Sequence, residues 1–178
     1  MNAQARGAVT LGALLLATPA TLWLFLANPQ SPSELGSRLA LGLSPDPYSA
    51  EMYAASELME RGRGFFAIEE PTDSEAGSAR RWLLEARARF ERAAARAGSA
   101  EEATRAREGW AGADLELARW GLRQGKGSGR WGTDDEDLFR WGLAYAREGL
   151  GLTGVSPELR AGLQDVEEEL DGELSFWR

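Results

Sequence analysis

Residues 72–99, "TDSEAGSARRWLLEARARFERAAARAGS", contain the pattern that decides the fold. Thr72 and Glu75 have the spacing of a capping box, which predicts the start of a helix, and Gly98 predicts its end. One apolar stripe recurs at spacings of three and four residues: Leu83, Ala86, Phe90, Ala93 and Ala97. Because alanine predominates in this stripe, we expect a neighbouring helix to pack closely against it.

Similar start and stop patterns divide the rest of the chain into helices. Further starts follow Ser31, Ser99, Thr133 and Ser156, and the stops fall at Gly42, Pro71, Gly98, Gly125 and Gly149. The predicted helices are 32–41, 48–69, 73–97, 100–124, 134–149 and 157–170. No stretch alternates β-branched or aromatic residues with polar ones, so no strand is expected. The sequence predicts an all-α fold, a stack or bundle of about six helices joined by short connections.

The N-terminal segment is different from the rest in composition. No charged residue occurs from Gly7 to Gln30, and residues 8–27 are long enough as a helix to cross a bilayer core of ~30 Å. Pro19 is tolerated in a spanning helix, and Trp23 lies where interfacial indoles are favoured. We therefore expect a single transmembrane anchor within residues 1–30, followed by an exported helical domain over 31–178. A cleaved signal peptide and a buried core helix are the alternatives.

The flanking charges predict the orientation of this anchor. Arg6 and the amino terminus precede it, whereas Glu34 is the first charged residue after it. The positive-inside rule then places the N-terminus in the cytoplasm. The expected location is the bacterial inner membrane, with the C-terminal domain in the periplasm.

Composition excludes several classes of function. The chain has no Cys and no His, so thiolate nucleophiles, Ser-His pairs and the usual zinc sites are excluded. A net charge of -8 disfavours nucleic-acid binding, which depends on Lys and Arg. The acidic run 134–137 lacks the spacing of a calcium loop and is typical of a helix start, and Gly125–Gly129 lacks the spacing of a phosphate loop. We expect no enzyme activity, no cofactor and no metal site.

A row of arginines lies opposite the alanine stripe in the helix predicted over 73–97. Its members are Arg81, Arg89, Arg92 and Arg96. Two interpretations are open. The arginines are solvated or pair internally with the acids of segment 156–178, or they form a basic surface for an acidic partner.

Five of the seven tryptophans fall into two groups. Trp110, Trp120 and Trp141 lie within predicted helices, where core packing explains them. Two others fall in a loop and in the C-terminal tail, and with their neighbours they are candidate partner-binding residues: Arg130, Trp131, Phe176 and Trp177. An aromatic side chain in such a position can fill a partner's pocket or enter the membrane interface.

Parts of the chain resemble tetratricopeptide-type helical hairpins. The first-helix pattern of that family, a large apolar residue, then Gly, then an aromatic, occurs at Leu58, Gly62 and Phe65, and again at Leu138, Gly142 and Tyr145. The second-helix pattern occurs at Ala86, Phe90 and Ala93. No constant repeat period connects them. The resemblance implies a protein-binding scaffold built from helical hairpins.

These features favour a membrane-anchored structural or assembly subunit that docks on a larger complex, such as a photosynthetic, respiratory or secretion assembly. Its partners would be other membrane-complex subunits, and the bilayer through residues 8–27. The alternative is an exported module that binds cell-wall glycan or peptides through Arg-Trp pairs. A glycosidase that uses two carboxylates is the third hypothesis, but no pair of acids stands in an apolar setting in the sequence.

Overall fold

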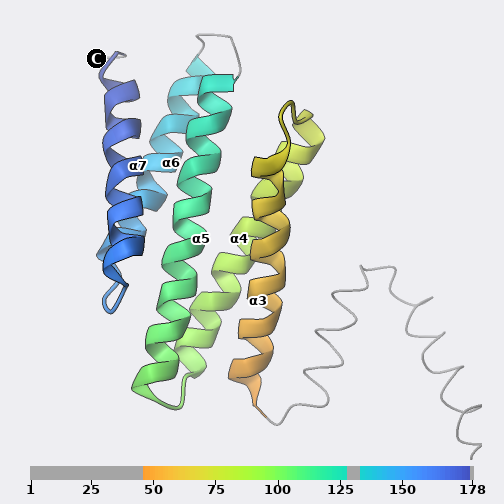
Figure 1. Ribbon diagram of the computed structural model, residues 1–178, viewed down its shortest axis with the longest axis vertical. Helices are drawn as coiled ribbons and strands as arrows, with labels where there is room; N and C mark the ends of the chain where they lie inside the picture. The colour runs from red at the N-terminus through yellow and green to blue at the C-terminus, as the bar shows by residue number, and fades with distance from the viewer. Residues whose placement is uncertain (1–45, 128–132, 177–178) are drawn as a thin grey trace, which may run out of the picture. The chain divides into compact units, whose positions relative to one another are not determined.

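The computed structural model describes residues 46–127 and 133–176 (Figure 1). Over these residues the chain forms α3 (Pro47–Gly64), the 3-10 turn η1 (Phe65–Ala67), α4 (Asp73–Arg96), α5 (Ala100–Gly127), α6 (Thr133–Gly151) and α7 (Pro157–Ser175). The described part contains no strand, so its all-α class is confirmed. No helix in these two ranges is long and apolar enough to cross a membrane. The expected anchor at 8–27 and the expected helix at 32–41 lie outside the described residues.

The helix starts follow the local sequence closely. The Thr72 hydroxyl accepts from the Glu75 amide at 3.3 Å, and the Glu75 carboxylate accepts from the Thr72 amide at 2.8 Å, which confirms the predicted capping box. At the start of α5 the Glu102 carboxylate accepts from the amide of Gly98 at 2.7 Å, and not from the amide of Ser99 as in a capping box. The polar side chains thus satisfy first-turn amides that have no partner within the helix.

The predicted helix ends are less accurate. The first helix of the described part ends at Gly64 and continues as η1, although we expected it to run to 69. In contrast, α5 runs to Gly127 and α6 to Gly151, past the glycines expected to stop them. Gly154, with φ 80°, makes the turn before α7. Glycine lowers helix propensity without ending a helix whose sides are packed.

Consecutive helices run in opposite directions and pack side by side (Figure 1). Besides these neighbours, α3 contacts α5 and α5 contacts α7. No Cα atom of α4 comes within 8 Å of one of α6 within the described part. The helices therefore form an alternating stack, in which α5 contacts all four of the others.

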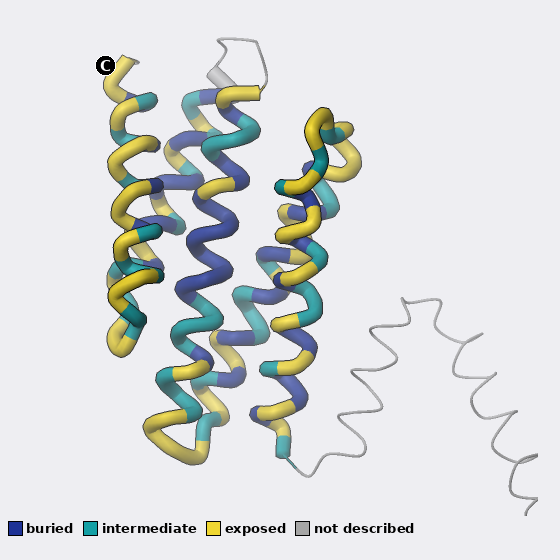
Figure 2. The backbone as a smooth tube through the Cα atoms, viewed as in Figure 1, coloured by how far each residue is buried: buried dark blue, intermediate teal, exposed yellow. Residues whose placement is uncertain are grey.

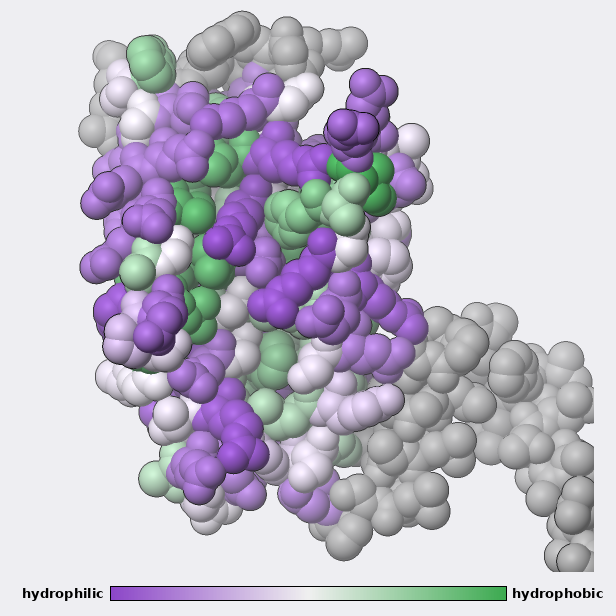
Figure 3. All heavy atoms as spheres, in the orientation of Figure 1, coloured by the Kyte–Doolittle hydropathy of each residue, from purple (hydrophilic) through white to green (hydrophobic). Residues whose placement is uncertain are grey.

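The central position of α5 explains its burial (Figure 2). Every residue from Ala111 to Ala118 is buried, including the acidic Asp114 and Glu116. The outer sides of α3 and α7 are largely exposed (Figure 2). On the side of the domain in Figure 3, hydrophilic residues predominate, with hydrophobic ones visible between α7 and α5.

Two glycines bring α5 and α6 into backbone contact. A Cβ atom on Gly121 would lie 2.8 Å from the Leu138 carbonyl oxygen and 3.1 Å from the Gly142 Cα. Both glycines thus admit a close neighbour. Since the obstacle is backbone, it cannot rotate away as a side chain could.

We expect Gly121→Ala to lower the free energy of unfolding by about 1–3 kcal/mol, because α5 and α6 must move apart. The matched control is Gly77→Ala in α4, where nothing lies within 4 Å of the added Cβ. That change should raise the stability by roughly 0.5–1 kcal/mol through helix propensity. Urea unfolding followed by circular dichroism measures both. Equal effects of the two substitutions would contradict the close approach.

Candidate functional site

Of the two predicted partner-binding residues near the C-terminus, the structure describes Phe176. Phe176, which follows the final helical residue, is 78% exposed. Trp177 lies outside the described residues, as do Arg130 and Trp131. The structure places the end of α5, the start of α6 and the end of α7 at the same end of the domain (Figure 1).

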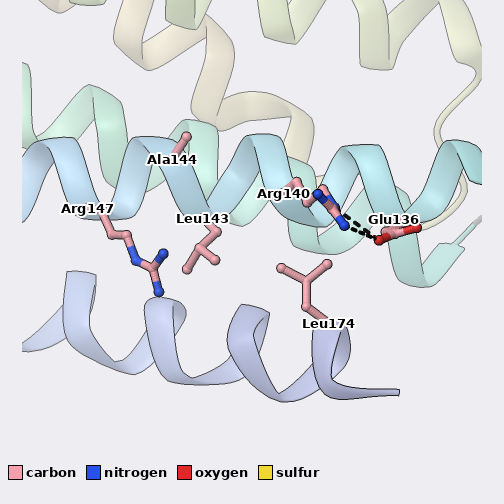
Figure 4. A pocket seen from close by; sticks show the side chains of 6 residues that line it. All are labelled: Glu136, Arg140, Leu143, Ala144, Arg147 and Leu174. Atoms are coloured by element: carbon pink, nitrogen blue, oxygen red, sulfur yellow. Dashed lines mark hydrogen bonds and ion pairs between the residues drawn. The ribbon is translucent and has the colours of Figure 1, made fainter. Parts of the chain in front are cut away.

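A pocket of about 610 Å³ lies between α6 and α7 (Figure 4). Leu143 of α6 and Leu174 of α7 point toward each other across it, and Leu174 is two residues before Phe176. The remaining lining residues are Glu136, Arg140, Ala144 and Arg147. Three of the lining residues are thus apolar and three are charged, a mixed lining of the kind found at the surfaces where proteins bind one another.

Ion pairs hold α7 against the helices beside it. The Lys126 ammonium at the end of α5 lies 2.5 Å from a Glu169 carboxylate oxygen and 3.0 Å from one of Glu173. Hydrogen bonds to these two carboxylates raise the pKa of Lys126. Arg147 of α6 similarly contacts Glu167 at 2.8 Å. The acids of segment 156–178 therefore pair with α5 and α6.

The row of arginines on α4 has a different partner from the one expected. Three of them contact one buried carboxylate on α3, that of Glu51: Arg89 at 3.4 Å, Arg92 at 3.2 Å and Arg96 at 2.7 Å. The internal pairing predicted with segment 156–178 is thus made with α3 instead. Arg81 lies on the exposed side, where it donates to the Ser78 hydroxyl at 3.2 Å.

The helical tryptophans pack as predicted for a core. Trp120 is 5% exposed, and its indole N–H donates to the Ala76 carbonyl at 2.9 Å. Its ring meets that of Trp141 edge to face at a centroid distance of 5.6 Å. The Trp141 ring in turn meets that of Tyr145 at 4.4 Å. Such edge-to-face contacts suit the quadrupoles of aromatic rings.

Two arginines of α4 extend across this aromatic row. The Arg80 guanidinium lies 4.4 Å from the centroid of the Trp141 ring, and that of Arg87 lies 5.2 Å from the centroid of the Trp110 ring. Arg87 is also 5.5 Å from the Tyr145 ring. The contacts with Trp141 and Tyr145 connect α4 to α6, whose backbones do not touch, and the contact with Trp110 connects α4 to α5.

Arg87 also contacts two carboxylates of unequal burial. Its Nε donates to Asp114 of α5 at 2.7 Å, and its Nη2 pairs with Glu148 of α6. Asp114 is fully buried, and desolvation raises its pKa to about 7, even though Arg87 opposes the shift. Sequence reasoning missed this group. Its only trace in the sequence is an acidic residue between Ala113 and Leu115 in an apolar run.

The described residues contain no group of three or more acidic side chains placed to hold a metal ion. Asp114 is the kind of apolar-site carboxyl that a glycosidase would need, but it has no exposed surface through which a substrate could reach it.

Comparisons with protein-family models, with curated proteins and with solved structures find no match to this chain.

Proposed function

We propose that the chain is a single-pass membrane-anchored scaffold subunit that docks on a larger membrane protein complex. Residues 8–27 would span the bilayer, with the N-terminus in the cytoplasm and the helical domain in the periplasm. The uncharged apolar run supports the anchor, and the net charge of -8 suits a solvated domain that does not bind nucleic acid.

The observation that carries the docking proposal is the exposure of Phe176 at the end of α7, two residues after Leu174, which lines the pocket between α6 and α7. A phenylalanine that is 78% exposed gains most of its burial energy only when a partner covers it. Leu143 and Leu174 line the pocket but are themselves 7% and 5% exposed, so Phe176 provides most of the exposed apolar surface at this end of α7. The basic row on α4 is the weaker candidate, because three of its arginines already share Glu51.

The alternating contacts of the helices support a tetratricopeptide-like scaffold. In such solenoids each helix packs on the next helix in the chain, and helices two apart also contact each other. Here α3 contacts α5, and α5 contacts α7. A Cβ on Gly62 would lie 2.5 Å from Leu83, so this glycine admits α4 as the family pattern implies. The two copies of that pattern fall on α3 and α6, however, and these helices have different positions in the stack.

Binding of glycan through Arg-Trp pairs is supported less well. Trp120 is 5% exposed and so offers no ring to a sugar. Arg80 lies over the Trp141 ring. Within this alternative the remaining Arg-Trp pairs are Arg81-Trp82, in which Trp82 is 37% exposed, and Arg130-Trp131, outside the described residues.

We expect a photo-reactive phenylalanine analogue at position 176 to cross-link the full-length protein to one or a few membrane proteins in cells. Phe176→Ala should reduce co-purification of those same proteins at least tenfold, which corresponds to about 1.4 kcal/mol of contact energy. The thermal midpoint of unfolding should stay unchanged, because the side chain has few contacts within the domain.

Tyr53 on α3 provides the matched control, since this aromatic is 60% exposed on another helix. The analogue at position 53 should give no such products, and Tyr53→Ala should leave co-purification intact. Identical products from both positions would indicate non-specific proximity and would count against docking through Phe176.

A further inference from the structure

The interior of the helical stack contains a carboxyl group that is only half satisfied. Asp114 has no exposed surface, and one of its oxygens accepts from Arg87 Nε at 2.7 Å. The other oxygen, Oδ2, is buried and has no hydrogen-bond partner among the described residues, and the same is true of the indole N–H of Trp110 one helical turn earlier. A buried carboxylate with an unpaired oxygen is costly, because nothing replaces the water it loses.

The helices on either side hold Asp114 in place. A Cβ atom on Gly149 of α6 would lie 3.2 Å from the Asp114 Cβ, so the α6 backbone is close against it. From α7, Leu163 packs at the same level and brings no charge. On the α3 side, Met59 contacts Gly112. Helix α3 also supplies Arg63, whose acidic partner on α5 is Glu116.

The charges that face Asp114 come from α4 and α6. Arg87 is the cation, and it also pairs with Glu148, whose side chain is 50% exposed. Glu148 and Glu91 both raise the pKa of Asp114 through their negative charges. The Tyr145 phenol lies on the same side, and burial raises its pKa. One guanidinium is thus shared by two carboxylates, and the buried carboxylate has lost its water.

We propose that Asp114 is a proton-binding site whose ionisation weakens the packing between α4, α5 and α6. The proton resides on Oδ2, because Oδ1 already accepts from Arg87. The neutral acid therefore still accepts the hydrogen bond from Arg87 Nε. The positive charge of Arg87 is then balanced by the Glu148 carboxylate alone. Loss of the proton places an unpaired negative oxygen among apolar side chains, and the stack becomes less stable.

Few other groups of this chain titrate near neutral pH, so the titration of such a site can be observed separately. The chain has no His and no Cys, so no side chain ordinarily titrates between about pH 5.5 and 8. The pKa of Asp114 near 7 falls inside this interval. Because its pKa is raised in the folded state, stability should be highest below the unfolded value and should be lost as the pH rises to about 7.

Equilibrium unfolding of the full-length protein in a neutral detergent tests this directly. The unfolding constant should increase by up to tenfold per pH unit from about pH 5.5 to 7, and then become constant. Asp114→Asn, which keeps an oxygen acceptor for Arg87 but cannot titrate, should remove this dependence. The same slope in both proteins would overturn the proposal.

A second measurement does not depend on whether Asp114→Asn folds. The side-chain carboxyl ¹³C resonance of Asp114 in the wild-type protein should titrate with a midpoint near pH 7. Glu148→Gln should move the midpoint down, since it removes a negative charge and leaves Arg87 to Asp114 alone, whereas Arg87→Met should move it up. A midpoint below about pH 5, or shifts of the same sign in the two variants, would refute the proton site.

Discussion

Replacement of Arg87 by methionine should destabilise the helical domain by about 3–5 kcal/mol at pH 8.5. Methionine keeps an apolar stem beside the Trp110 and Tyr145 rings, but it removes the only cation that pairs with Asp114 among the described residues. At pH 5.5, where Asp114 is largely protonated, we expect roughly half that loss. The remaining loss comes from the hydrogen bond, the pair with Glu148 and the cation–π contacts.

Urea unfolding at the two pH values, with and without Asp114→Asn, measures this effect. Arg87→Met should cost less when Asp114→Asn is also present, and the difference is the coupling energy between the two groups. Arg81→Met on the same helix is the control, because that guanidinium is exposed and among the described residues donates only to Ser78. We expect a change within ~0.5 kcal/mol. A loss at Arg87 as small as that would mean that Asp114 is not desolvated in the folded protein.

Phe90→Ala should be comparably damaging, with a loss of about 3–5 kcal/mol. Phe90 is 4% exposed, and its ring lies so close over Gly109 of α5 that it would overlap a Cβ atom there. Truncation leaves a cavity between α4 and α5, since the helices are held apart by their other contacts.

The control for this prediction is Trp82→Ala, a larger truncation on the same helix. Trp82 is 37% exposed, so its removal should cost about 1 kcal/mol or less. Guanidinium unfolding of the two variants compares them under one set of conditions. A larger loss for Trp82 than for Phe90 would show that the alanine stripe of α4 is not the side that packs on α5.

Local sequence rules were sufficient to predict the helices of the described residues but not all of their ends. Thr72 with Glu75 marks a start because a capping box joins residues three apart in the sequence. Pro157 marks another because proline suits the first position of a helix, although Ser156 makes no side-chain capping bond. The predicted helix end at Gly125 was wrong, because tertiary packing determines where α5 ends. That residue packs under the Phe139 ring of α6, and α5 continues beyond it.

The charged clusters could not be predicted, because their partners are distant in the sequence. Glu51 of α3 forms ion pairs with arginines of α4. Asp114 of α5 forms an ion pair with one arginine of α4, which also pairs with Glu148 of α6. Nothing in the sequence distinguishes Glu51 from the exposed glutamates of the same helix. Phe176 is exposed, as its place in the tail suggested. Partner binding by Phe176, Arg130, Trp131 and Trp177 stays a prediction.

The most direct test of the proposed function is the size of the full-length protein after extraction in a mild detergent. We predict that it migrates within a complex much larger than one chain, together with membrane proteins that are lost when Phe176 is replaced by alanine and kept when Tyr53 is replaced. Migration of the wild-type protein as a monomer alone, at all detergent concentrations that keep it folded, would contradict the scaffold role.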